Sequence, residues 1–275
     1  MAHPQIAAFA RLAKENTPPT RLIAGQKTLL SRTMHDIRYD AVHDEFVVVN
    51  PFAQAILTFR GGADGEEPPI RIIQGTSTQL RDLQRVDLDP IHNEIFVPSG
   101  DAILVFRREA NGNVEPTRVI RGPNTRLRQV ETVAVDPARN LLTVGADIYA
   151  IARGASGGGA IVMFNRSDSG NAKPRAVIQG PNTGIVRLIQ IRVLPSGWIV
   201  AAQPGIREEQ EPEGVYVGVW HVNDNGDIPP RWKLAGPNSL LKKPRGVALN
   251  PKNKELIIAD MRLNSVLTYY FPEIF

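Results

Sequence analysis

The sequence predicts an all-β protein, a single β-propeller built from four-stranded antiparallel blades. The first observation is that one short segment with an arginine at its second position recurs five times. The second is that glycine (23) and proline (22) are numerous in a chain without low-complexity tracts, as many short strands joined by tight turns require. Apolar residues make up 42% of the 275 residues, which is enough for a core. Closed all-β folds reach this length as one unit, so residues 1–275 are predicted to form a single domain.

The recurring segment sets the length of one blade. Its arginines are Arg21, Arg71, Arg118, Arg175 and Arg231, so the steps are 50, 47, 57 and 56 residues. Such periods are typical of propellers, in which each repeat is one small sheet. A β-sandwich would also show regular turns, but it would not repeat a segment at this long period.

Four strands can be placed in order within each repeat, as the second copy shows. A loop of the GPNTxL type comes first, and RVDLD (85–89) follows it as the first strand. NEIFVPS (93–99) and AILVF (102–106) are the second and third strands, rich in β-branched and aromatic residues. A glycine turn then leads to the fourth strand, which carries the arginine. Each repeat therefore predicts one blade.

The two ends of the chain predict how the ring closes. Residues 6–25 copy a third and a fourth strand, with Phe9 and Arg21 spaced as in the next repeat. We therefore expect five blades, closed by pairing of the N-terminal strands with the C-terminal repeat. SVLTYY (265–270) also has the pattern of a third strand, so there are six third strands for five of each other kind. A six-bladed ring with one defective blade is the alternative.

The last repeat resembles the NHL repeat. In PRGVALNPKNKELIIADMRLNSVLTYY (244–270) the residues that match the pattern are Pro244, Gly246, Ala248, Asp260 and Asn264. GNVEPTRVIRG (112–122) is similar to a stretch found in bacterial propellers of this type. The place of Gly246 is taken in the other copies by Asp36, Arg85, Thr132 and Gln190. The resemblance implies a propeller, and since NHL propellers include protein-binding and RNA-binding scaffolds as well as enzymes, it implies no single activity.

Charged and polar residues are predicted at the mouth of the central channel, where the first strands begin. The candidate ligand-binding residues there are His35, Gln84, Glu131, Gln190 and Arg245. Four further charged residues follow on the first strands of the first two repeats: Asp36, Arg38, Arg85 and Asp87. Because buried charges persist only when they are paired, we expect these four to form ion pairs between blades.

No cofactor is predicted, and a divalent metal in the channel is the weaker alternative. Its ligands would be His35, Asp36 and Glu131, because imidazole and carboxylates suit several divalent ions. The chain has no cysteine, which excludes disulfides and thiolate sites. No GxSxG, HExxH, Walker or GxGxxG pattern occurs in a suitable setting, so an enzyme is not the favoured interpretation.

Two long loops are predicted between second and third strands of adjacent repeats, at residues 145–159 and 203–214. Long loops in a compact domain are usually functional. Both open on the face of the channel mouth, where they would form a wall on one side of a cleft. Four of their residues are added to the ligand-binding candidates: Tyr149, Arg153, Gln203 and Arg207.

These features predict a non-catalytic binding scaffold, which uses the loop face around the channel to bind a protein, a peptide or a small ligand. One alternative is a metal-dependent propeller enzyme of the hydrolase, lactonase or lyase kind. The other is a polyanion or RNA binder, since the five loops leading into the first strands carry ten basic and three acidic residues, 10 − 3 = +7 against +4 for the chain. We expect a soluble chain without a signal peptide and without a membrane partner. The sequence does not determine its cellular compartment.

Overall fold

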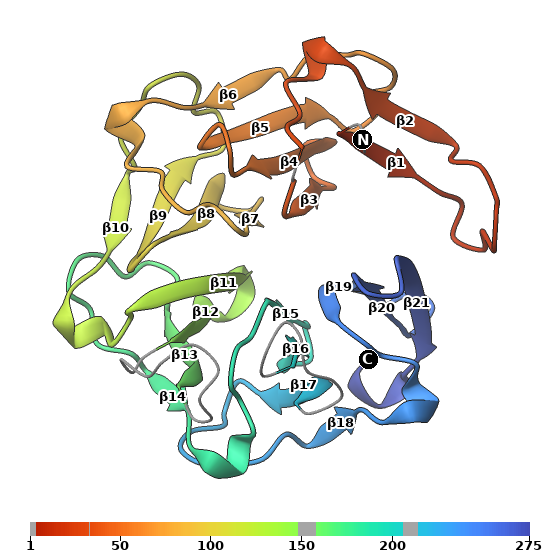
Figure 1. The fold of residues 1–275 in the computed structure, drawn as a ribbon. Helices are drawn as coiled ribbons and strands as arrows, with labels where there is room; N and C mark the ends of the chain where they lie inside the picture. The colour runs from red at the N-terminus through yellow and green to blue at the C-terminus, as the bar shows by residue number, and fades with distance from the viewer. Residues whose placement is uncertain (1–3, 33, 148–157, 206–213) are drawn as a thin grey trace.

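The computed structural model describes residues 4–32, 34–147, 158–205 and 214–275. Its regular structure is almost entirely β, and five antiparallel blades are arranged in a ring (Figure 1). The five-bladed all-β propeller predicted from the sequence is therefore confirmed, and the six-bladed alternative is not. Among the described helical segments none combines the length and the hydrophobicity that a membrane crossing would need.

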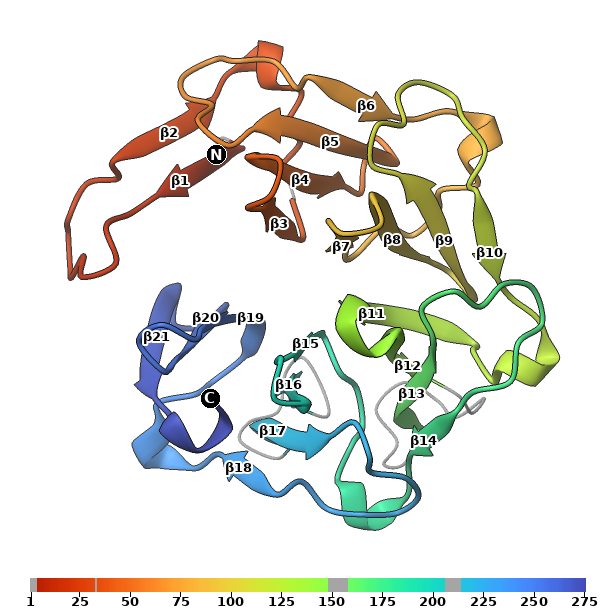
Figure 2. The ribbon, with the colours of Figure 1, turned by 180° about the vertical axis from the view of Figure 1, so that it is seen from behind.

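Each blade is a meander of strands that starts near the centre of the ring (Figure 2). The strands of the first two blades are β3 (Ile37–Asp40), β4 (Glu45–Asn50), β5 (Ala55–Arg60), β6 (Arg71–Ile73), β7 (Asp87–Asp89), β8 (Glu94–Ser99), β9 (Ala102–Arg107) and β10 (Arg118–Ile120). Those of the next two are β11 (Gln129–Asp136), β12 (Leu141–Asp147), β13 (Gly159–Asn165), β14 (Ala176–Ile178), β15 (Gln190–Val193), β16 (Trp198–Pro204), β17 (Val215–His221) and β18 (Trp232–Leu234). In the described residues the fifth blade has three strands, β19 (Pro244–Asn250), β20 (Glu255–Asp260) and β21 (Ser265–Tyr270).

The hydrophobic core lies between the blades. Second and third strands such as β8 and β9 are apolar on both faces because each blade packs between two neighbours, and Phe96 and Phe106 are fully buried. One cluster joins the first and second blades, and others join the second to the third, the third to the fourth and the fourth to the fifth. Continuous apolar strands are therefore explained by burial on both faces.

The GPNT-type loops form short 3-10 turns between the blades. These turns and two others are η1 (Gln26–Thr28), η2 (Thr76–Thr78), η3 (Pro123–Thr125), η4 (Pro137–Arg139), η5 (Pro181–Thr183), η6 (Pro237–Ser239) and η7 (Pro272–Ile274). In η5 the Thr183 hydroxyl donates to the carbonyl oxygen of Gly180 at 2.6 Å. The side chain of Asp227, in the next blade, accepts from the backbone N–H of Asn182 at 2.8 Å. The recurrence of these residue types thus reflects a link between consecutive blades.

The two ends of the chain meet, but not through the predicted β-ladder. β1 (Gln5–Ala8) and β2 (Arg21–Ala24) form a separate two-stranded sheet, and in the described residues no ladder joins either of them to β21. β2 lies against the first blade through a bridge from Ile23 to Gly65, as later fourth strands lie against their neighbours. The N-terminal hairpin contacts the fifth blade through an ion pair, in which Arg11 donates to Glu255 at 2.5 Å. Both candidate third strands at the ends are formed. β1 pairs with β2, and β21 pairs with β20 instead.

Candidate functional site

A cavity of about 1000 Å³ begins at the central channel and extends between the first and fifth blades. Residues of β1, β3 and β4 lie on one side of it, and residues of β19, β20 and β21 on the other. Ile37 and Val266 belong to its apolar walls, and the channel end is lined by charged side chains. Concave surfaces with a few convergent polar groups are the default sites for ligands.

Five of the nine predicted ligand-binding residues line this one cavity: His35, Gln84, Glu131, Gln190 and Arg245. They come from five different blades or the loops that enter them, so the propeller brings together residues far apart in the sequence. Three others, Tyr149, Arg153 and Arg207, lie outside the described residues.

Gln203 does not face the cleft, and the prediction for this residue was wrong. Its side chain is fully buried, with the carbonyl oxygen accepting from the backbone N–H of Val186 at 2.7 Å. Its amide nitrogen donates to the backbone oxygens of Gly184 and Gly214, at 3.1 and 2.9 Å. Gln203 therefore satisfies backbone groups of two loops, as a buried amide must.

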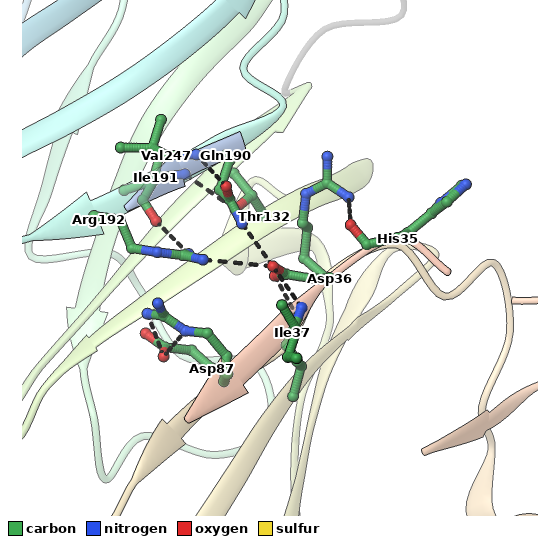
Figure 3. Close-up of polar contacts among 12 residues, drawn as sticks. His35, Asp36, Ile37, Asp87, Thr132, Gln190, Ile191, Arg192 and Val247 are labelled. Atoms are coloured by element: carbon green, nitrogen blue, oxygen red, sulfur yellow. Dashed lines mark hydrogen bonds and ion pairs between the residues drawn. The ribbon is translucent and has the colours of Figure 1, made fainter. Parts of the chain in front are cut away.

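Asp36 is the centre of a buried polar network across the channel (Figure 3). Its carboxylate accepts from Gln190 Nε2 at 2.7 Å and from Arg192 Nη2 at 3.4 Å, so the first blade is linked to the fourth. It also accepts from the backbone N–H of Val86 at 3.2 Å, in the loop that enters the second blade. Burial, with the positive charge of Arg38 nearby, lowers the pKa of Arg192 to about 10, so this arginine is charged near neutral pH.

Of the four residues predicted to form ion pairs between blades, Arg38 and Asp87 pair with each other, Asp36 pairs with Arg192, and Arg85 is held in another way. Arg38 donates from Nε to Asp87 Oδ1 at 2.7 Å, which joins the first two blades. Arg85 instead donates to backbone carbonyls, those of Ile189 and His35 at 2.8 and 2.7 Å. Burial lowers the pKa of Arg85, and the carbonyl oxygens compensate part of its lost hydration.

The three candidate metal ligands are not brought together. His35 Nδ1 lies 2.6 Å from Gln84 Oε1, whereas Asp36 faces Gln190 and Glu131 accepts from Arg187 Nη2 at 3.4 Å. Among the residues that the structure describes, no three His, Asp or Glu side chains form a group suited to a metal ion. Each candidate is held instead by a different partner around the channel.

The cavity has an excess of positive charge at its channel end. The charged residues of its lining are Arg38, Arg85, Arg187, Arg192, Arg245, Asp36 and Glu131, which with neutral His35 gives 5 − 2 = +3. Asp87, which pairs with Arg38 just outside the lining, reduces the local excess to 5 − 3 = +2. In a partly desolvated cavity such an excess favours an anionic group more strongly than it would in water.

No protein-family model matches this chain, and no curated protein matches it. The geometry of the cavity is therefore the observation from which a function can be argued.

The basic loop ring is only partly available to an external partner. Arg85 and Lys243 are buried, Arg187 is paired with Glu131, and Arg81 is paired with Asp101. Arg126 donates to Gln179, and Arg245 also interacts within the protein, so at least six of the ten basic residues counted from the sequence are engaged or lie in the interior. This arrangement favours a ligand inside the cavity over a long polyanion lying across the loops.

The apolar wall formed by the fifth blade was missed in the sequence analysis. Ile257 and Met261, on and just after β20, and Val266 on β21 line the cavity because the predicted end-to-end ladder does not form. The surplus third strand was the signal in the sequence, since two strands with the same pattern cannot both pair with one edge.

We expect His35 to titrate below its ordinary pKa of about 6.5. Partial desolvation is the main cause, opposed by the contact with Gln84 and reinforced by Arg85 and Arg245. Since the unfolded chain then binds a proton at higher pH than the folded one, this contribution to stability is present above pH 6.5 and decreases as the pH falls through the folded pKa. NMR titration of the imidazole, with Arg245→Gln expected to raise the midpoint, is the measurement. A midpoint at or above the ordinary value would contradict the prediction.

Proposed function

We propose that this propeller is a non-catalytic binding protein, and that its ligand is a small amphipathic anion held in the cavity between the channel and the first and fifth blades. The observation that carries the proposal is the excess of positive charge, +2 with Asp87 included, at the channel end of a cavity of about 1000 Å³. A carboxylate or phosphate group is the chemistry that converging guanidinium groups recognise.

The rest of the cavity supports an apolar body for the same ligand. Ile37 and Val48 lie on the side of the first blade, and Ile257, Met261 and Val266 on the side of the fifth. Burying apolar ligand surface against such a wall contributes roughly 25 cal/mol per Å². A molecule with an acidic head and an apolar chain would therefore use both ends of the cavity.

The polar network explains why binding is favoured over catalysis in this proposal. Asp36 and Glu131 are engaged by Gln190, Arg192 and Arg187, so neither carboxylate is positioned as a free general base. Membership of the NHL-repeat group belongs to the same proposal, supported by the residue pattern of the last repeat and by the propeller fold.

Decanoate is expected to bind more tightly than decanol, because only the acid has a charge for the channel arginines. Arg245→Glu should weaken decanoate by roughly tenfold or more, as one charge-assisted hydrogen bond contributes about 1.5–3 kcal/mol. Isothermal titration calorimetry with both compounds measures the difference directly.

Arg126→Glu is the matched control, since Arg126 belongs to the basic loops but does not line the cavity. This variant should bind decanoate like the parent protein. Equal affinity for decanoate and decanol, or equal effects of the two substitutions, would contradict the proposed site.

A further inference from the structure

The outer edge of β21 differs from the corresponding edges in the other blades. β5 pairs with β6, and β9 pairs with β10, so a fourth strand covers the third. β21 pairs with β20, and in the described residues no fourth strand follows it. Val266 as a whole residue is 67% exposed, whereas Ile103 at the same place in β9 is 0% exposed. β21 therefore offers an accessible, unpaired strand edge.

Glu255 lies where the glutamates of other blades pair with an arginine of the fourth strand. In the first two blades the arginine of the fourth strand pairs with the glutamate that begins the second strand, Arg71 with Glu45 and Arg118 with Glu94. Glu255 begins β20 opposite Tyr270, in the register in which Glu94 lies opposite Arg107. An acceptor for a fourth-strand arginine is thus in place beside β21.

The arginine that contacts Glu255 comes from outside the blade, and within the blade Asn250 Nδ2 donates to the other carboxylate oxygen at 2.7 Å. Arg11, from the loop between β1 and β2, donates to Glu255, and its side chain is 47% exposed against 14% for Glu255. A half-exposed arginine held by one exposed contact contributes little to stability. An incoming arginine could replace it at small cost.

We propose that the free edge of β21 binds an extended segment of a partner protein, which adds antiparallel to β21 as a fourth strand. The segment has the pattern arginine, apolar residue, isoleucine, with the arginine pairing with Glu255 and the isoleucine opposite Val266. Backbone hydrogen bonds along the edge provide affinity, and the charge pair and the apolar contact provide register and specificity.

The fourth strands among the described residues are engaged elsewhere, so none of them is available to cover this edge. β2 pairs with β1 on one side, and on the other it bonds Gly65, with Ala24 N–H donating to Gly65 O at 2.9 Å. A second copy of the chain would present the same engaged strand. A segment that is free before it binds does not have to give up such contacts.

A synthetic peptide of residues 113–122, NVEPTRVIRG, is the probe, because it carries the pattern in the register seen on β9. In fluorescence anisotropy it should bind the protein, and Arg118→Glu in the peptide or Glu255→Arg in the protein should each weaken binding at least about tenfold. Combining the two substitutions should restore binding. Glu67→Arg, at a partly exposed glutamate of the first blade, is the control and should leave the affinity unchanged.

The absence of cysteine allows the register to be tested by cross-linking. Val266→Cys in the protein should form a disulfide with a peptide carrying Ile120→Cys. The proposal is overturned if the peptide does not bind, if the charge exchange fails to restore affinity, or if the protein dimerises through this edge. It is also overturned if Ile23→Cys and Val266→Cys in one chain cross-link spontaneously, since β2 itself would then occupy the edge.

Discussion

Replacing Asp36 by leucine is expected to lower the free energy of unfolding by about 3–5 kcal/mol, because it leaves a buried guanidinium without its carboxylate. Arg192 is buried, and Asp36 is the carboxylate that it contacts across the channel. The substitution also removes acceptors for Gln190 and for the backbone N–H of Val86. Denaturant unfolding followed by tryptophan fluorescence measures the loss.

A second substitution separates the lost ion pair from the altered shape. Adding Arg192→Met to Asp36→Leu removes the unpaired charge, so the double variant should be more stable than Asp36→Leu alone. Glu67→Leu removes the exposed pair with Arg60 and should change stability by less than about 1 kcal/mol. A double variant as unstable as Asp36→Leu, or a single variant as stable as the parent, would show that the pair does not hold the blades together.

The period of the arginine segments was sufficient to predict the blades, since one strand meander per repeat is a local property of the sequence. The second strand predicted at residues 93–99 corresponds to β8 (Glu94–Ser99), and the third at 102–106 to β9 (Ala102–Arg107). Alternation of apolar segments and turn residues is read within one repeat and needs no knowledge of distant contacts.

The residues at the channel mouth could be predicted from the sequence, but their hydrogen-bond and ion-pair partners could not. His35, Gln84 and Gln190 were expected at the mouth and do line one cavity. The partners of Asp36 and Arg85 depend on which blades face each other across the ring, and Arg85 bonds Ile189, more than one hundred positions away. Local sequence carries no information about such pairs.

Ring closure was the least predictable part, because two segments had the same pattern. Residues 6–9 and 265–270 both read as third strands, and only one of them can pair with β2. The choice depends on packing, in which Ile6 joins the apolar cluster around Ile23 and Phe46. That preference for a neighbouring blade cannot be derived from strand periodicity.

Replacing Gly180 by alanine is expected to destabilise the protein by about 2–3 kcal/mol, because the backbone there lies in a region that is essentially closed to residues with a Cβ. Gly180 has φ +135° and ψ 173° at the start of η5. An added Cβ would lie 2.3 Å from Asp227 Cγ, the side chain that ties this loop to the next blade. The midpoint of denaturant unfolding is the measurement.

Gly184, at the other end of the same turn, is the matched control. It has φ +65°, and the equivalent positions hold Leu29, Gln79, Arg126 and Leu240 at φ 57° to 63°. Gly184→Arg should therefore cost about 1 kcal/mol, the ordinary cost of the left-handed conformation for a residue with a side chain. Asp227→Ala in the Gly180→Ala background removes the clashing carboxylate. The double variant should therefore lose less stability than the sum of the losses in the two single variants. Equal losses for Gly180→Ala and Gly184→Arg would mean that backbone conformation alone, and not the link between blades, makes glycine necessary at this position.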